Sequence, residues 1–284
     1  MDKQSKLEKA VKDAGLTESE AILALKGIKS YHPSQVKTIT TGHKSFSYTY
    51  FTDAHIGHSK FVEALFYKMI NDIKKRKPEF VIDSGDHFEG MSGRPGHVYE
   101  LAQMGYSAQM RKVEELYKQI PVPIFGIDGN HDEWYSKKNN GGVIVGEEMQ
   151  KIIPNYKHLG VMEGNIFVDG IKIMLFHPND GTAYAHSYKL QKLIESFTGG
   201  EKPNIVHSGH YHKQLAMVTR NVFGFEGGTL CGQSEFMKGK KIAAHMGYGH
   251  ITVYHNGQGT IDRLVHEFVP YFEEPQKPYK FRGK

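Results

Sequence analysis

The sequence predicts an α/β fold, a four-layer α-β-β-α sandwich of two mixed sheets flanked by helices, preceded by a short helical leader. Three observations support this prediction. From Phe46 onward, short apolar runs typical of buried strands alternate with longer amphipathic runs typical of helices, which favours a largely parallel sheet. Polar motifs follow several strands, at the edge where such sheets bind ligands. After Arg220 the sequence becomes β-like and glycine-rich, which indicates antiparallel strands that complete a second sheet.

The individual strands and helices follow from the spacing of apolar residues. Between residues 61 and 75, apolar side chains recur at helical spacing and form one stripe, made of Phe61, Leu65, Phe66, Met69, Ile70 and Ile73. Cations at 74–77 follow this stripe, where they complement the helix dipole. Further helices are expected over 99–119, 144–153 and 188–197. Strands are expected over 46–51, 80–82, 124–127, 171–176, 204–206 and 251–254.

The chain is expected to comprise a helical leader over residues 1–40, a main domain over residues 41–272 and a flexible basic tail over residues 273–284. In the leader, Gly15 ends a first amphipathic helix, and Thr17 with Glu20 forms a capping box for a second. Two such helices fit half of a DNA-binding helix-turn-helix, or a pair that packs on the main domain and seals an edge. The second interpretation is favoured, because amphipathic helix pairs are common.

Composition limits the classes of function. With 39% hydrophobic and 24% charged residues, the 284-residue chain has an ordinary globular composition. A single cysteine excludes an intramolecular disulfide framework, and the charged N-terminus has no apolar segment of a signal peptide, so a cytoplasmic location is expected. No apolar run is long enough to span a membrane, and no membrane partner is expected. A net charge of +5 favours anionic partners, nucleic acid among them, and leaves the oligomeric state open.

Five short segments place oxygen and nitrogen ligands directly after buried strands. Their seven candidate metal ligands are Asp53, His55, Asp86, Asn130, His177, His210 and His212. They include no thiolate, which suits Mn²⁺, Fe or Zn²⁺ in a catalytic centre rather than a structural zinc. Two cations about 3.5–4 Å apart need a bridging carboxylate. Asp86 is the expected bridge, because the glycine before it lets the backbone turn tightly and approach the ions.

These motifs, in this order, resemble the calcineurin-like metallophosphoesterase superfamily, and the resemblance runs through about residues 49–212. It implies that residues 41–272 form a metallophosphoesterase domain that binds two divalent metal ions. One ion would be held by Asp53, His55, Asp86 and His212, and the other by Asp86, Asn130, His177 and His210. The resemblance further implies that His131 is not a ligand but protonates the leaving oxygen. A carboxylate after Asp86 would orient it; here that residue is Glu89, where the family more often has aspartate.

The chemistry expected of this centre is hydrolysis of a phosphate ester. Two cations lower the pKa of a bound water toward about 7, and the metal-bound hydroxide attacks phosphorus in line. Protonation of the leaving oxygen by His131 would contribute roughly 10²–10⁴-fold. Manganese is the expected metal, and iron, zinc, nickel and magnesium are alternatives.

The substrate class is less sharply indicated. The chain lacks the arginine after the second motif and the Asn-His-Glu of phosphoprotein phosphatases. Its Asn130-His131-Asp132 and Gly-His-x-His motifs are shared with cyclic-nucleotide phosphodiesterases and with the nuclease subunit of double-strand-break repair. A phosphodiesterase or nuclease is therefore favoured. A phosphomonoesterase or protein phosphatase is the alternative, and a non-catalytic interaction subunit is disfavoured by the complete ligand set.

Two residues near the bridge are candidate substrate contacts. Arg94, in the glycine-rich loop after Asp86, could bind a substrate phosphate, or could lie exposed on a flexible loop. His87 could reach the pocket, or could support a neighbouring ligand. Residues 179–186 could line the substrate entrance, although the start of a helix is favoured. Residues 236–241, which contain three lysines, are expected to form a solvated turn rather than a nucleic-acid patch.

Overall fold

A computed structural model of the chain describes residues 13, 15, 17, 36–137, 142–181 and 183–272. The chain divides into two compact units, Met1–Ser34 and Gln35–Lys284. The expected helices of the leader lie outside the described residues, apart from three single positions, and the basic tail at 273–284 lies outside them as well. Within the second unit, Val36–Ile39 forms a strand, β1, although this segment falls in the range expected for the leader.

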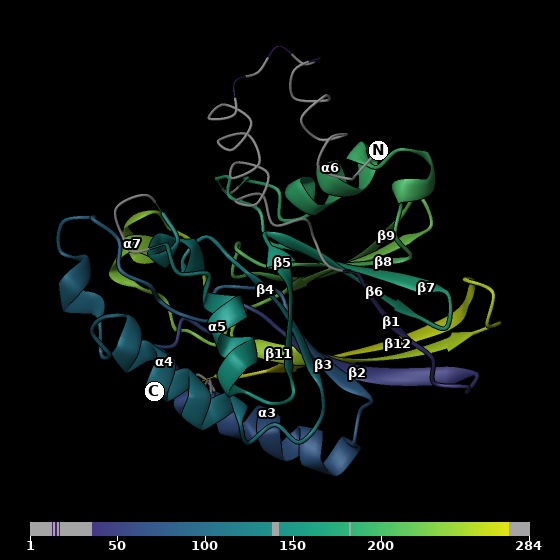
Figure 1. Ribbon diagram of the computed structural model, residues 1–284, viewed down its shortest axis with the longest axis horizontal. Coiled ribbons are helices and arrows are strands. Elements are labelled where there is room, and N and C mark those ends of the chain that lie inside the picture. The colour runs from purple at the N-terminus through teal and green to yellow at the C-terminus, as the bar shows by residue number, and fades with distance from the viewer. Residues whose placement is uncertain are drawn as a thin grey trace, which may run out of the picture. The chain divides into compact units, whose positions relative to one another are not determined.

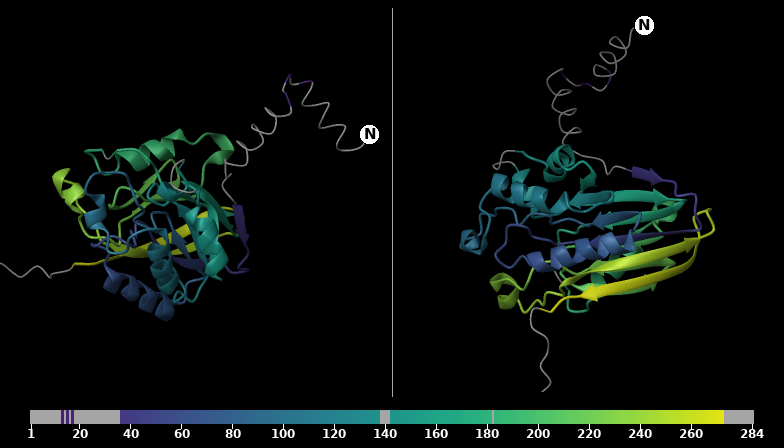
Figure 2. Two further views of the ribbon diagram at one scale, coloured as in Figure 1. Left: turned by 60° about the vertical axis from the view of Figure 1, so that its left-hand side comes forward. Right: turned by 90° about the horizontal axis from the view of Figure 1, so that it is seen from below.

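Two six-stranded sheets form the centre of the second unit (Figure 1). The first sheet contains, in spatial order, β12 (Ile261–Pro270), β11 (Gly247–His255), β2 (Ser45–Phe51), β3 (Phe80–Asp83), β4 (Ile124–Asp128) and β5 (Tyr156–Val161). Strands β2 to β5 are parallel, and β11 and β12 are antiparallel. Both kinds of pairing therefore occur in one sheet, as the sequence predicts. Figure 2 shows the yellow β11 and β12 at its edge.

The second sheet is mixed as well. It contains, in spatial order, β1, β6 (Glu163–Val168), β7 (Ile171–Phe176), β8 (Ile205–Ser208), β10 (Val222–Gly227) and β9 (Gln214–Thr219). Strand β8 runs parallel to both β7 and β10, whereas β6 with β7 and β9 with β10 form antiparallel pairs. The parallel strands β7 and β8 end side by side, and this edge carries two of the sequence motifs.

Helices cover the outer faces of both sheets (Figure 1). Helices α3 (Glu63–Arg76), α4 (Tyr106–Tyr117) and α5 (Val145–Ile152) pack on the first sheet, and α6 (Tyr188–Ser196) packs on the second. A third apolar cluster lies between the sheets, where Tyr48, Ile82 and Ile127 face Ile173, Leu175 and Ile205. Side chains alternate along each strand, so Val81 joins the helical layer while Phe80 and Ile82 join this central layer. The structure confirms the predicted four-layer sandwich.

Local boundaries differ from the prediction at one helix. The helix expected over 99–119 begins only at Tyr106, because Gly105 has φ 82° and ψ 162°, which no α-helix accommodates. Residues His97–Glu100 form a separate 3₁₀ turn. Two further short 3₁₀ turns, Asp132–Tyr135 and Gly199–Glu201, and a small helix, α7 (Glu235–Gly239), connect the larger elements. Among the described residues, no helix has the length and apolarity that crossing a bilayer requires.

Candidate metal centre

The ends of parallel strands carry the polar motifs. Asp53 and His55 follow β2, Asp86 follows β3, and Asn130 follows β4 in the first sheet. In the second sheet, His177 follows β7, and the pair His210 and His212 follows β8. Because the chain brings these ends together, the described residues include two compact groups of candidate ligands. These groups are Asp53, His55 and His212, and Asp86, His177 and His210.

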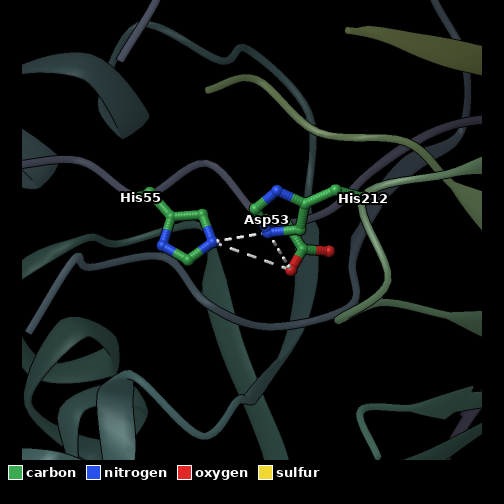
Figure 3. Close-up of side chains that lie close together, drawn as sticks. All are labelled: Asp53, His55 and His212. Carbon is green, nitrogen blue, oxygen red and sulfur yellow. Dashed lines mark hydrogen bonds and ion pairs between the residues drawn. The ribbon is translucent and has the colours of Figure 1, made fainter. Parts of the chain in front are cut away.

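The first group has three donor atoms that converge (Figure 3). Nε2 of His55 lies 2.9 Å from Nε2 of His212. Oδ1 of Asp53 lies 3.3 Å from that His212 nitrogen and 3.8 Å from the His55 nitrogen. Two imidazole nitrogens and a carboxylate oxygen facing one point are the ligand types that a borderline divalent cation binds.

Asp86 lies between the first group and the second. Its Oδ2 is 3.7 Å from Nε2 of His55 on one side and 3.3 Å from Nε2 of His177 on the other. Oδ1 of Asn130 completes the second group, at 2.7 Å from Nδ1 of His210 and 3.2 Å from Nε2 of His177. One carboxylate therefore borders two sets of nitrogen and oxygen donors.

Hydrogen bonds fix the orientation of three of the four imidazole rings. Nδ1 of His55 donates to Oε2 of Glu89 at 2.8 Å, and Nδ1 of His177 donates to the carbonyl oxygen of Ser84 at 2.7 Å. Nε2 of His210 donates to the carbonyl oxygen of Asp180 at 2.7 Å. Because these partners are acceptors, the opposite ring nitrogen of each histidine faces the centre and is the atom that would bind a cation.

Backbone strain is concentrated at the same residues. Five candidate ligands have left-handed backbone conformations, with φ of 51° at Asp53, 49° at His55, 55° at Asp86, 78° at His210 and 54° at His212. Each such conformation costs on the order of 1–3 kcal/mol in a residue that has a Cβ atom, and such strain clusters at functional sites. A hydrogen bond from the backbone N–H of His210 to Oδ2 of Asp53, at 2.9 Å, ties two of the strained segments together.

Two motif glycines leave room for the ligands. A Cβ atom on Gly129 would lie 2.2 Å from Oδ1 of Asp86, and one on Gly209 would lie 2.7 Å from Nδ1 of His177. No real Cβ makes contacts this short, so a side chain at either position would displace a candidate ligand. The glycines of the Gly-Asn-His-Asp and Gly-His-x-His motifs are therefore required by packing around the centre.

The two buried carboxylates remain ionised. Burial raises the pKa of Asp86, but His177 and His131 outweigh this effect and hold its pKa below the ordinary value. Burial likewise raises the pKa of Asp53, and His212 and His55 outweigh it, so this pKa is also lowered. Two carboxylates with exposed fractions of 0% and 1%, surrounded by imidazole nitrogens, provide the oxygen and nitrogen donors that suit divalent cations.

Comparison with known proteins identifies the family. The family model described as calcineurin-like phosphoesterase matches residues 46–254. The chain belongs to the calcineurin-like phosphoesterase family. The chain is 22% identical over 253 residues to the DNA polymerase II small subunit of Methanothermobacter thermautotrophicus, and the match covers 73% of the chain and 52% of that protein. It is 22% identical over 264 residues to that of Archaeoglobus fulgidus, covering 78% of the chain and 53% of that protein.

The chain spans about half the length of the curated relatives it matches. Among solved structures, an archaeal phosphodiesterase is 15% identical with a TM-score of 0.46, covering 78% of this calcineurin-like phosphoesterase and 99% of that chain. A phosphoesterase from E. coli is 13% identical with a TM-score of 0.43, and the match covers 77% of this chain and 98% of that chain. Vacuolar protein sorting 29 from Cryptosporidium parvum is 12% identical with a TM-score of 0.45, and the match covers 80% of this chain and 99% of that chain.

The side chain of Glu89 lies closer to His55 than to His131, the residue that the family resemblance implies it would orient. Its carboxylate was expected to orient His131, but Oε2 lies 3.6 Å from Nδ1 of that ring, and Nδ1 donates instead to the Glu89 backbone carbonyl at 2.8 Å. The carboxylate accepts hydrogen bonds from His55 and, at 2.7 Å, from Nε2 of buried His97. Glu89 therefore supports His55 with its side chain and His131 with its backbone.

His131 lies beside the candidate ligands. Its backbone N–H donates to Oδ1 of Asp86 at 2.8 Å, and its ring lies 4.6 Å from that of His55. Burial lowers the pKa of His131 to about 4, against the opposing effects of Asp86 and Glu89. The ring is therefore neutral at pH 7 without substrate, and an anionic phosphate placed beside it would raise its pKa.

A pocket of about 520 Å³ opens beside these residues. Arg94 lines it, and its Nη2 donates to Oε2 of Glu100 at 2.8 Å. Asp180, from the segment 179–186, also lines the pocket, whereas α6 begins only at Tyr188.

His87 is placed away from this pocket, in contrast to its expected contact with substrate. Its ring is fully buried, with Nδ1 at 2.6 Å from Oδ2 of Asp83 and Nε2 at 2.9 Å from the hydroxyl of Tyr156. We therefore do not assign His87 to substrate binding. The sequence reasoning overlooked three pocket or support residues, Trp134, Phe236 and His97. Only the aromatic character of the first two could have suggested them.

Proposed function

We propose that this calcineurin-like phosphoesterase is a two-metal hydrolase that cleaves phosphodiesters of nucleotides or nucleic acid. The observation that carries the proposal is the position of Asp86, whose Oδ2 borders His55 on one side and His177 on the other. A carboxylate shared between two ligand sets is the arrangement that a two-metal centre requires.

The donor set supports this proposal. Asp53, His55, Asp86 and His212 would hold one cation, and Asp86, Asn130, His177 and His210 would hold the other. Every donor is a carboxylate, amide or imidazole, which suits Mn²⁺ and also fits iron, zinc, nickel or magnesium. When bound, the cations supply Lewis acidity, lower the pKa of a coordinated water and neutralise phosphoryl charge.

His131 is proposed to protonate the leaving oxygen. The Glu89 carbonyl accepts from its Nδ1, so Nε2 is the atom that carries the transferred proton. The ring lines the pocket together with His55 and Asn130, and this shared lining supports contact between His131 and a substrate bound at the centre. A substrate phosphate stabilises the protonated ring, so the proton is acquired as the anion binds.

The names of the curated relatives favour nucleic acid as the source of the diester. The matched relatives are named as small subunits of DNA polymerase II, and this name associates the shared sequence with DNA. The Asn130-His131-Asp132 motif, with aspartate where phosphoprotein phosphatases have glutamate, also points away from phosphoprotein substrates. A phosphomonoesterase of the same family is the alternative.

Hydrolysis of two chromogenic esters tests the proposal. With Mn²⁺, bis-p-nitrophenyl phosphate is expected to be cleaved with a higher kcat/KM than p-nitrophenyl phosphate, and a chelator is expected to abolish both reactions. On a dinucleotide, whose leaving alkoxide needs a proton, His131→Ala is expected to lower kcat about 10²–10⁴-fold with Mn²⁺ content unchanged. A preference for the monoester contradicts the diesterase assignment, and an unchanged kcat contradicts the role of His131.

A second candidate is a non-catalytic subunit of a nucleic-acid enzyme. The relatives named as polymerase subunits favour it, since such a subunit acts inside an assembly. The complete set of seven candidate ligands opposes it. Metal analysis separates the two functions: fewer than one ion per chain after incubation with Mn²⁺, together with no hydrolysis of either ester, supports the non-catalytic subunit.

A further inference from the structure

One wall of the pocket carries an aromatic ring that the hydrophobic core does not use. Phe236, on α7, is 49% exposed and lines the same pocket as His131 and His210. A half-exposed aromatic ring on a pocket wall offers an apolar surface that a ligand can contact. Trp134 also lines this pocket, with its ring 4.0 Å from that of His131.

A guanidinium group lies over the Phe236 ring. The central carbon of the Arg94 guanidinium is 5.3 Å from the ring centroid, within the range of a cation–π interaction. Glu100 fixes this position by accepting from Nη2 at 2.8 Å. A guanidinium has five N–H donors in a planar fork, so this ion pair leaves donors to meet a phosphate.

A second cation lines the pocket next to the ring. Lys240 caps the end of α7, four residues after Phe236, and this spacing places the two side chains on one side of the helix. Both line the pocket, whereas Lys238 of the same helix does not. The segment 236–241, expected to be a solvated turn, therefore contributes an aromatic ring and one of its lysines to the pocket wall.

We propose that Phe236 is a stacking platform for a base of single-stranded nucleic acid, and that Arg94 and Lys240 bind phosphates next to the one being cleaved. The inference rests on the proposed function and narrows its substrate. Every base offers a π-face, so an exposed aromatic ring flanked by cations binds single strands without sequence preference. In a duplex the base faces are already stacked on one another, so they cannot stack on Phe236. A cyclic mononucleotide has one phosphate, which is too few for three cationic sites: the metal centre, Arg94 and Lys240.

The test compares two short single-stranded DNA substrates in Mn²⁺, one with natural bases and one with an abasic residue beside the scissile phosphate. Wild-type protein is expected to prefer the natural substrate in kcat/KM by about 5- to 150-fold, the range that stacking of one base supplies. In Phe236→Ala this preference is expected to collapse toward one, and Phe236→Tyr is expected to restore it. The control is Tyr99→Ala, at an 89% exposed aromatic outside the pocket lining.

The cationic part of the inference has its own measurement. In Lys240→Ala, the negative slope of log kcat/KM against log salt concentration is expected to become shallower by about 0.7, which corresponds to the loss of one phosphate contact to a single strand. Lys238→Ala on the same helix is expected to keep the wild-type slope. Equal slopes in the two variants overturn the assignment of Lys240.

Three results overturn the platform: equal cleavage of both DNA substrates by wild type, a preserved preference in Phe236→Ala, or cleavage of neither DNA while bis-p-nitrophenyl phosphate is hydrolysed. The last result leaves the proposed function intact. Absence of Mn²⁺-dependent hydrolysis of all three substrates is instead a failure of the proposed function, and it overturns this inference with it.

Discussion

The Glu89 carboxylate accepts a hydrogen bond from Nδ1 of His55 at 2.8 Å and so fixes the ring whose Nε2 faces Asp53 and His212. Burial raises the pKa of Glu89, but His131, His55 and His97 outweigh it and hold this pKa below the ordinary value, so the group is an anion. An anionic acceptor raises the basicity of a metal-binding imidazole. The Glu89 side chain, which the family resemblance implies would orient His131, therefore supports the candidate ligand His55.

Glu89→Gln is predicted to weaken Mn²⁺ binding about 10–100-fold, because it keeps the shape of the side chain but removes the charge behind His55. Titration with Mn²⁺ followed by calorimetry measures the affinity. The control is Glu115→Gln, which removes a carboxylate from a surface pair with Lys112. If Glu89→Gln instead lowers kcat at saturating Mn²⁺ with an unchanged affinity, the carboxylate serves His131 and not His55.

Gly129→Ala is predicted to destabilise the protein by about 1–3 kcal/mol and to lower its Mn²⁺ content, because the new Cβ would lie 2.2 Å from Oδ1 of Asp86. Chemical denaturation and metal analysis check the two effects. Gly93→Ala is the matched control, since a Cβ at Gly93 meets nothing within 4 Å. Wild-type stability and metal content in Gly129→Ala would show that Asp86 is not held in the described position.

The free energy of unfolding is predicted to fall below pH 6.5 through His207. Burial between the sheets lowers its pKa to about 3, and Nε2 lies 2.9 Å from the Tyr48 hydroxyl. In the unfolded chain His207 has the ordinary pKa of about 6.5, so between pH 6.5 and pH 3 it is protonated there but neutral in the folded protein. Its contribution to the free energy of unfolding is therefore fully present above pH 6.5 and is lost progressively as the pH falls toward 3. At pH 5 this histidine accounts for a loss of about 1–2 kcal/mol.

Denaturation of His207→Phe between pH 7 and pH 5 measures this contribution. The variant keeps an aromatic ring between Tyr50 and Phe225, whose centroids lie 4.7 and 5.3 Å away, and it is expected to show a flatter pH dependence. The exposed His43, replaced by Gln, is expected to leave the slope as in wild type. A slope in His207→Phe equal to that of wild type would assign the acid sensitivity to other groups.

The layered fold and the meeting of the ligands follow from local sequence. Strands such as 80–82 and 171–176 are short apolar runs, and parallel strands end at one edge, so residues just beyond them meet. Asp53 and Asp86 illustrate this: their strands, β2 and β3, are neighbours that pair in parallel register. Motif glycines reinforced the prediction, because the tight approach that they permit is a property of the backbone.

Other features depend on side-chain partners that the sequence does not encode locally. Oε2 of Glu89 lies 2.8 Å from Nδ1 of His55 and 3.6 Å from Nδ1 of His131, a difference that no sequence pattern predicts. Three lysines follow Phe236, so the sequence indicates a solvated turn there and not a pocket wall. Strand β12 alternates between intermediate and exposed positions and includes Asp262, Arg263 and Glu267, so it lacks an apolar signal. Strand β12 is instead held in the sheet by its antiparallel pairing with β11, to which a hairpin connects it.

Two cations are proposed to share the carboxylate of Asp86, and anomalous scattering from crystals of the Mn²⁺-loaded protein tests this proposal most directly. Two manganese peaks about 3.5–4 Å apart are predicted, each bonded to an oxygen of Asp86, with one peak beside His55 and the other beside His177. A single peak, or two peaks of which Asp86 contacts at most one, would contradict the shared bridge and the two-metal chemistry built on it.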